Sequence, residues 1–508
     1  MDERAPVLIG VAQRSVRPGD PPAGDLPLEG ASDPLALLEL VARGALADAG
    51  LGQDGVAALD AIGLVDALGW SPRNGPRLLA ERLGASPRLE LVTGVGGEGP
   101  LVLLSHAARA IARGECELAL LAGVNVIRSF RLARAKGVHL DLPLGGLGTP
   151  TAVSQTRPGH SPREARYGLV LPVAVYPLFE NALRARRGET LAAHRTRMGA
   201  LMAPFTRVAA ANPHAWFPQE RSGEELVRVG PENRLVAFPY PKYLNAVIET
   251  DQAAAVLVAS AGAARRLGVP AARDVGWWGG GGAVEDPWFA TERPDLSACP
   301  ALGSAARGAL AEADVDVASL AHFDLYSCFP VAVELACEAL GLAEDDTRGL
   351  TLTGGLPYAG GPGNNYCLHA VAAAVERVRA RGGSALVTGN GWYLTKHSAA
   401  VLGPGARPLR AAPGGAAPGT DAARAPAPPV ELVEEAAGAA SVETYTVVYD
   451  RAGAPTQGIV VGRQHDGRRF LAELPPDPAL LEAFAAVEGV GRDGRVAAHD
   501  GRNRFEPR

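Results

Sequence analysis

Lysine is almost missing from this chain of 508 residues: only Lys136, Lys242 and Lys396 occur, and the formal net charge at pH 7 is −6. Aromatic residues make up only 5% of the sequence, and no run of basic residues accompanies them. These shortages exclude a stacking platform for bases and a polybasic surface, and with them nucleic acid or an anionic membrane as the main partner. Glycine and proline are instead abundant, with 62 and 41 copies. This bias is typical of a GC-rich genome, so single glycines carry less structural information than usual.

Long apolar runs and paired cysteines are also missing. No uninterrupted apolar stretch reaches the roughly 20 residues of a membrane span, and the charged start Met1–Pro6 shows no signal peptide. The five cysteines are odd in number and show neither a disulfide framework nor metal-ligand spacing. The sequence therefore predicts a reduced, cytoplasmic protein without a metal site.

The length of the chain predicts more than one domain. Strand and helix patterns alternate in two successive halves, which suggests an internal duplication of a βαβ-rich unit. Between 403 and 430 the chain is mostly alanine, proline and glycine, as in a linker. The predicted divisions are a first half at 1–265 with an inserted loop subdomain at about 128–240, a second half at 266–402, the linker at 403–430 and a small β-barrel-like domain at 431–508.

The most informative segment joins a strand, a glycine turn and a helix. Leu89–Val92 reads as a strand, and a helix follows from Pro100 to Arg113. The N-terminus of a helix favours negative charge, so enzymes often place a reactive group there. The turn Gly94–Gly99 contains no cysteine, serine or histidine. The sequence therefore offers no nucleophile at this turn.

Two glycine patterns have weaker functional interpretations. Gly94, Gly96 and Gly99 formally satisfy the dinucleotide fingerprint G-x-G-x-x-G, but the expected acidic residue is absent from a strand tip, which disfavours a nicotinamide or flavin site. The run Gly279–Gly282 lacks the Lys-Ser/Thr of a phosphate-binding loop, and we expect it to be a loop of biased composition.

The order of several blocks resembles the thiolase superfamily. It is most similar to the sterol-carrier-protein-linked branch, and within it to thiolase-like proteins of type 1, which append a small C-terminal domain. The blocks that carry this resemblance are Gly96–Gly99, Tyr240–Asn245, Asp251–Ala255, Tyr326–Phe329, Gly354–Tyr366, Gly391–His397 and the tail block Gly467–Ala472.

The resemblance implies an α/β fold: a thiolase-type duplicated five-layer αβαβα core with an inserted loop subdomain, plus a small C-terminal β (OB-like) domain. Thiolases combine a nucleophilic cysteine, an activating histidine, a second cysteine and an oxyanion hole. Carried over by position, the first three fall at Gly96, Gly361 and Gly389, and the Asn/His-x-x-Phe block begins at Tyr326. Acyl transfer through a cysteine is chemically unavailable at such a site.

Polar residues remain beside the expected pocket. Tyr326 offers a phenol as hydrogen-bond donor or acid, the alternative being a core tyrosine. His369 offers an acid or base, Asn364 and Asn365 offer amide donors, and Cys328 offers a thiol, against packing, turn or inert buried roles. These five residues are the predicted catalytic set.

A second set is predicted to hold the ligand's anionic part. Lys396 and His397 follow a strand and fit a phosphate or carboxylate, the alternative being a solvated loop. Lys242 lies between tyrosines and fits the path of coenzyme A (CoA). The predicted binding residues are Gly96, Gly97, Glu98, Lys242, Lys396 and His397.

The resemblance implies an acyl-CoA ligand and an acetyl-CoA acetyltransferase-like, lipid-metabolism setting, with no bound cofactor. Without the nucleophile, we expect either non-covalent C–C bond cleavage or formation, as in a retro-aldol or retro-Claisen lyase, or simple binding. The alternative is a catalytically inactive scaffold that docks a partner protein through its C-terminal domain. The sequence leaves open whether the protein forms a homodimer.

Overall fold

A sheet covered by helices on both faces forms the first half of the chain. In the computed structural model, which describes residues 2–409 and 428–508, its strands lie in the order β3–β2–β4–β8–β1. The apolar run 118–126 forms β4, which is buried along its whole length, as the sequence predicts for a strand covered on both faces. Asp33 caps α1 by accepting hydrogen bonds from the backbone N–H groups of Leu35 and Ala36. The elements of this half are β1 (Pro6–Ser15), α1 (Pro34–Asp48), α2 (Gln53–Ala57), β2 (Ala61–Leu64), α3 (Gly75–Leu83), β3 (Leu89–Val92), α4 (Gly99–Arg113), β4 (Leu118–Val126), β8 (Asp251–Ser260) and α10 (Ala261–Arg266).

An inserted segment of helices and short strands separates β4 from β8. Its longest helices, α7 and α8, pack against α12 of the second half, and Tyr176 of α7 stacks on Phe329 at a centroid distance of 4.4 Å. This insertion therefore lies over the second half of the core. Its elements are α5 (Ile127–Lys136), β5 (Thr151–Ala152), α6 (Pro162–Arg166), α7 (Pro172–Arg186), α8 (Leu191–Ala211), α9 (Gly223–Val227), β6 (Leu235–Ala237), β7 (Tyr240–Pro241) and η1 (Lys242–Leu244).

The second half repeats the arrangement with a sheet in the order β9–β12–β11–β10. Short pairing of Val7 with Gly276 and of Leu8 with Val275 joins β9 to β1, so the two sheets are continuous. Its elements are η2 (Ala271–Arg273), β9 (Val275–Val284), η3 (Ala290–Glu292), α11 (Pro300–Ala313), η4 (Val317–Ser319), β10 (His322–Asp324), α12 (Pro330–Leu340), α13 (Tyr366–Arg381), β11 (Ala385–Gly391) and β12 (Lys396–Pro404).

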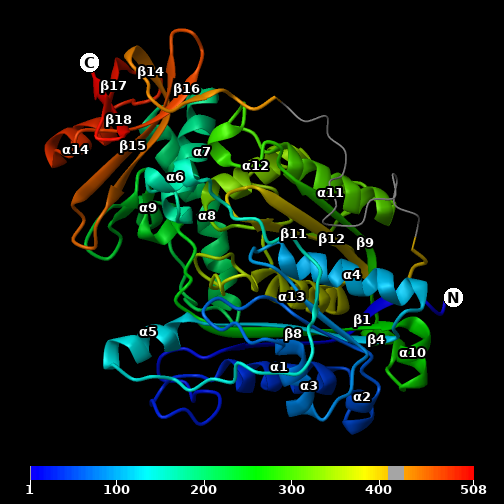
Figure 1. The fold of residues 1–508 in the computed structure, drawn as a ribbon. Helices are drawn as coiled ribbons and strands as arrows, with labels where there is room; N and C mark the ends of the chain where they lie inside the picture. The colour runs from blue at the N-terminus through cyan, green and yellow to red at the C-terminus, as the bar shows by residue number, and fades with distance from the viewer. Residues whose placement is uncertain (1, 410–427) are drawn as a thin grey trace.

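The layers of the core can be followed from bottom to top in Figure 1. Helices α1 and α3 cover the outer face of the first sheet, α4 and α13 lie between the two sheets, and α11 and α12 cover the second sheet. This is the five-layer αβαβα arrangement that the resemblance implies. Both central helices begin at glycine-rich loops, and these loops position the candidate site.

The glycine run 279–282 belongs to β9, so the expectation of a loop is wrong. A Cβ atom at Gly281 would lie 1.9 Å from the carbonyl oxygen of Ala305, and one at Gly279 would lie 2.6 Å from that of Ala309. Helix α11 therefore rests directly on the backbone of β9, which only glycine allows. The run has a packing role that composition alone does not reveal.

The C-terminal elements form a closed ring of strands. Strands β14, β15, β16, β18 and β17 each pair with the next, and β17 pairs back with β14. The ring is attached to the core: β6 extends it through β14, and buried Arg469 donates hydrogen bonds to the carbonyl oxygens of Thr291 and Arg293. Most of the expected linker 403–430 lies outside the described residues. The elements are β13 (Leu432–Val433), β14 (Gly438–Tyr449), β15 (Pro455–Gln464), β16 (Arg469–Glu473), α14 (Pro478–Ala486), β17 (Asp493–His499) and β18 (Arg502–Pro507).

None of the helices in the described ranges is both long and apolar enough to cross a membrane.

Candidate functional site

The N-terminus of α4 meets the loop before α13 at the centre of the molecule. The backbone N–H of Gly96 donates a hydrogen bond to Oδ1 of Asn364 at 2.9 Å, and Nδ2 of Asn364 donates to the backbone and side chain of Asp66. Gly389 lies on the other side, because a Cβ there would be 3.0 Å from Cα of Glu98. The structure thus brings two of the glycine positions of the thiolase-like catalytic set to one place.

A buried ion pair occupies the space beside Gly96. Nζ of Lys396 lies 2.6 Å from Oε1 of Glu98, and the two side chains are only 3% and 4% exposed. The ammonium group also donates to the carbonyl oxygen of Val95 at 2.7 Å. Burial raises the pKa of Glu98, and the charge of Lys396 opposes that rise. The anion-favouring end of α4 is therefore filled by the chain's own carboxylate.

The glycines and this ion pair depend on each other. A Cβ at Gly96, where φ is +146°, would lie 2.1 Å from Oε2 of Glu98 and 2.8 Å from Nζ of Lys396. At Gly391 it would lie 1.8 Å from Oε2 of Glu98. A cysteine side chain at position 96 cannot coexist with this arrangement. The Glu98–Lys396 ion pair therefore occupies the space that a side chain at position 96 would need.

Tyr326 faces the same turn. A Cβ at Gly97 would lie 2.2 Å from its hydroxyl oxygen, so the missing side chain makes room for the phenol. Tyr326 borders a cavity of about 10 Å³ that also touches Gly389 and Asn390. Burial raises the pKa of Tyr326 well above its usual value. The phenol is thus protonated and able to donate.

The thiols near this turn are protonated and buried. Burial raises the pKa of Cys328 to about 12. Sγ of Cys367 donates to the carbonyl oxygen of Gly97 at 3.0 Å, and burial raises its pKa as well. Since the thiolate is the nucleophilic form, neither residue is prepared for attack.

His369 and Asn365 lie deeper, on α13 and at its start. Nδ1 of His369 is 3.0 Å from Oε1 of Gln13, and its Nε2 atom has no partner among the described residues. Burial lowers the pKa of His369 to about 3. Both amide atoms of Asn365 are buried without a partner in the same ranges, and its Oδ1 fills the space above Gly123. Asn365 therefore keeps a free donor beside Asn364.

Lys396 and His397 point to opposite faces of β12, because successive strand residues alternate. Lys396 reaches the N-terminus of α4, whereas His397 lies against Cys299 at the start of α11. Both are buried, at 2% and 3% exposure. The structure thus separates a pair that the sequence places together, and it adds Cys299, which no sequence signal marks.

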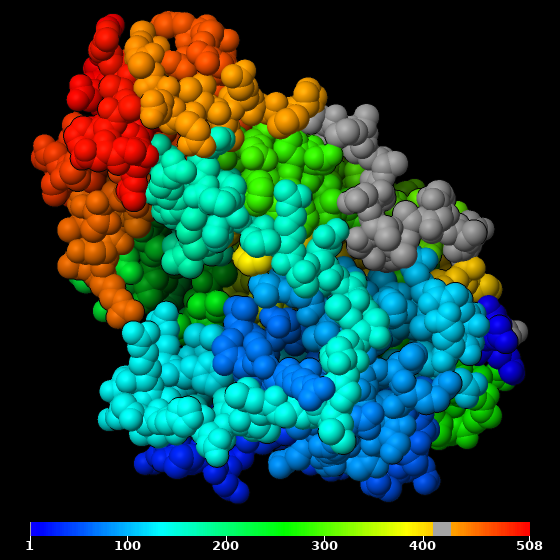
Figure 2. All heavy atoms as spheres, in the orientation of Figure 1, coloured from blue at the N-terminus to red at the C-terminus, as the bar shows by residue number. Residues whose placement is uncertain are grey.

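A second region, here called the basic cleft, lies at the surface. It encloses about 950 Å³ between α5, the segment 231–249 and the β14–β15 turn. Figure 2 shows the surface hollowed at the left of the view, where cyan, green and orange segments approach one another. Its lining residues are Arg131, Arg134, Ala135, Pro231, Arg234, Lys242, Glu249 and Arg451.

Most of the positively charged side chains that line the basic cleft have no acidic partner in the described residues. Arg131 pairs with Glu249. In contrast, four other cations of the lining form no ion pair within residues 2–409 and 428–508: Arg134, Arg234, Lys242 and Arg451. The sequence points to Lys242 but not to the arginines, because they come from segments far apart in the chain. Such a convergence of free cations fits a polyanionic ligand.

Three solved structures show the relationships of this fold. The crystal structure of a monomeric SCP2-thiolase like protein type 1 from Mycobacterium smegmatis is 34% identical, with a TM-score of 0.83 over 100% of this chain and 99% of that one. An Ltp2–ChsH2(DUF35) aldolase shares 20% identity and a TM-score of 0.57 over 79% and 98%. Human mitochondrial 3-ketoacyl-CoA thiolase in complex with CoA shares 15% and 0.56 over 80% and 99%.

The C-terminal ring has its own family. Residues 422–502 match the thiolase-like protein type 1 additional C-terminal domain. Comparison with curated proteins gave no match. The full-length similarity at 34% identity, together with this domain, shows that the chain belongs to the SCP2-thiolase-like protein type 1 family.

Proposed function

We propose that this protein binds a CoA thioester, with the phosphates of the ligand in the basic cleft. The observation that carries the proposal is the set of cations there that have no carboxylate partner in the described ranges. CoA carries its charge on phosphates, which arginine and lysine bind with charge-assisted hydrogen bonds. The related thiolase structure in complex with CoA supports the same ligand.

A short segment joins the basic cleft to the glycine positions. After Lys242, the backbone N–H of Ala246 donates to Cys328 at 2.9 Å, and that of Gly361 donates to Val247 at 2.8 Å. The five steps from Lys242 to Val247 span at most about 18 Å. A ligand that follows this segment inward reaches Gly361, the position of the thiolase histidine. We expect a ligand on this path to direct its thioester end towards Asn365 and Tyr326.

The chemistry we propose is non-covalent with respect to the protein. All five cysteines are buried, so no thiol is available for acylation. Tyr326 supplies a protonated phenol, and Asn365 supplies an unpartnered amide donor for a thioester carbonyl. These groups suit C–C bond cleavage or formation through a stabilised enolate. The aldolase among the structural neighbours supports this class of reaction. The free cysteines fit a reducing compartment, and we place the protein in the cytoplasm.

Calorimetric titration tests the proposal. The protein is titrated with CoA and with a short 3-ketoacyl-CoA, and NADPH is the control ligand. We expect micromolar binding of the thioester and no heat from NADPH. Lys242→Ala should weaken binding roughly tenfold, whereas Lys136→Ala, an exposed lysine of α5 outside the cleft lining, should not. The absence of a binding signal with every CoA species would overturn the proposal.

The second candidate is a scaffold whose C-terminal ring docks a partner. The ring has the strand order of an OB-like Greek-key barrel, and the Ltp2 structure contains a second protein, ChsH2. However, the ring of this chain is docked internally, since buried Arg184 pairs with Glu488 and Asn181 donates to the carbonyl oxygen of Tyr445. These contacts bury part of the ring's surface within the chain itself, which favours the ligand-binding proposal. The monomeric relative also favours a monomer over a homodimer.

A further inference from the structure

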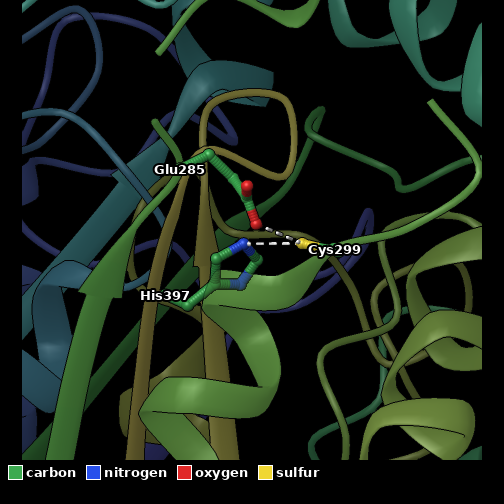
Figure 3. Close-up of side chains that lie close together, drawn as sticks. All are labelled: Glu285, Cys299 and His397. Carbon is green, nitrogen blue, oxygen red and sulfur yellow. Dashed lines mark hydrogen bonds between the residues drawn. The ribbon is translucent and has the colours of Figure 1, made fainter. Parts of the chain in front are cut away.

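Three buried side chains from distant segments meet behind β12. Glu285 follows β9, Cys299 precedes α11 and His397 lies in β12, and Figure 3 shows the three groups pointing towards one another. Their exposed fractions are 7%, 7% and 3%. The cluster lies on the opposite side of β12 from the Glu98–Lys396 ion pair, and the proposed function does not use it.

The separations within the cluster match those of metal ligands. Sγ of Cys299 is 3.1 Å from Nε2 of His397 and 3.5 Å from Oε1 of Glu285, and the three ligand atoms all lie within 4.8 Å of one another. Ligands of a tetrahedral zinc ion, at about 2.0–2.3 Å from the metal, lie roughly 3.3–3.7 Å apart. The two separations that involve Cys299 therefore differ from this range by at most a few tenths of an ångström.

The surroundings hold two of the ligands in orientation. Oε1 of Glu285 accepts a hydrogen bond from the backbone N–H of Ala301 at 2.7 Å, and Sγ of Cys299 donates to the carbonyl oxygen of Leu394 at 3.8 Å. Such outer contacts are typical of metal sites.

A second buried cluster provides a contrast. Glu180, His194 and Glu334 are equally close, but both nitrogens of His194 are taken by carboxylates, and Arg197 contacts Glu334 at 3.2 Å. Arginine already supplies the cation there. Near Cys299 the charged neighbour is Arg293, whose guanidinium donates to the carbonyl oxygens of Trp288, Tyr393 and Leu394 and to Thr395. It contacts none of the three ligand atoms.

We propose that Glu285, Cys299 and His397 bind one zinc ion. The ion displaces the thiol proton, so that Zn²⁺, one thiolate and one carboxylate give a neutral unit and one proton is released. The fourth position is left to a solvent molecule, as in sites with three protein ligands. The ion would tie the start of α11 to β12, the strand that presents Lys396 to the ion pair.

Metal analysis and cobalt substitution test this proposal. We expect about one zinc per untagged chain by plasma mass spectrometry. After chelation, added Co²⁺ should produce the thiolate-to-cobalt charge-transfer band and the visible bands of a tetrahedral site, with release of about one proton. Cys299→Ser and His397→Gln should lose the metal. Cys337→Ser, which removes another buried cysteine, should keep it.

The cobalt spectrum needs no variant, so misfolding of a variant does not decide the outcome. A folded, chelated protein that shows no charge-transfer band at saturating Co²⁺ would overturn the proposal. A folded Cys299→Ser variant that keeps the band and the zinc would do the same. Chelation should also lower the thermal midpoint of the unmodified protein but leave that of Cys299→Ser unchanged.

Discussion

Two of the three lysines occupy opposite environments. Lys242 is exposed at the rim of the basic cleft, where it has no acidic partner in the described ranges. Lys396 is 2% exposed and bonded to Glu98 and to the carbonyl oxygen of Val95. The ammonium group of Lys242 is therefore free to bind a ligand, whereas that of Lys396 is neutralised by Glu98 within the protein.

The two regions also differ in how much space they leave for a ligand. The basic cleft keeps about 950 Å³ of open volume and unpaired charge, whereas the space beside Gly96 is filled by an ion pair. The cavity next to Gly389 measures only about 10 Å³, close to the size of one water molecule. The basic cleft suits the binding of the CoA thioester that we propose, and the filled space beside Gly96 leaves no room for a cysteine side chain there.

The largest effect is expected from Lys396→Met. This change leaves the carboxylate of Glu98 buried and unpaired, which costs about 3–5 kcal/mol of unfolding free energy. Urea denaturation monitored by circular dichroism measures the loss. Adding Glu98→Gln should recover most of it, because the buried charge is removed.

The matched control is Lys242→Met, for which we expect a stability change within about 0.5 kcal/mol. If both lysine variants unfold at the same urea concentration, the ion pair does not hold the turn as the structure indicates.

The second effect concerns ligand affinity. Lys242→Glu combined with Arg451→Glu reverses two unpaired charges of the basic cleft, and we expect CoA affinity to fall roughly 100-fold. Titration calorimetry measures this change, and the stability of the variant should match that of the unmodified protein. Unchanged affinity in the folded variant would place the ligand elsewhere.

The third effect is a dependence of stability on pH, caused by the buried His369. Burial lowers the pKa of His369 to about 3, below the value of about 6.5 for an unfolded histidine. Between these values the unfolded chain binds the extra proton, so stability should fall with decreasing pH by up to about 1.4 kcal/mol per unit. His369→Gln should reduce this slope, and exposed His139→Gln serves as the control. Equal slopes in all three proteins would contradict the burial of His369.

The smallest effect should come from Glu249→Gln in the basic cleft. Removing this carboxylate frees Arg131 for the ligand. An exposed ion pair is worth about 0.2–1 kcal/mol, so CoA affinity should rise only two- to fivefold. Titration under the same conditions tests the change, and a decrease would show that Glu249 itself contacts the ligand.

The sequence predicts most of the fold because its strong signals are local. The apolar run 118–126 and the Asp33 cap specify β4 and α1 without tertiary information. The glycine run 279–282 leads to a wrong prediction of a loop, because these glycines are required by the close approach of α11, which is distant in the sequence. The resemblance to a known family supplies the layers and the appended domain.

The candidate site is less predictable for the same reason. Glu98 and Lys396 are about 300 residues apart in the chain, and only the fold shows that they neutralise each other. Cys299 and His397 likewise show no motif spacing. The glycines at 96 and 389 are visible in the sequence, but the side chains that pack against them are known only from the structure.

Mass spectrometry of the protein with a 3-ketoacyl-CoA tests the central claim most directly. Under native ionisation we predict a one-to-one complex with the intact thioester, and under denaturing ionisation the same sample should return wholly to the unmodified mass. An acyl group that remains on the chain after denaturation would contradict the account. A native spectrum without any complex at saturating thioester would contradict it equally.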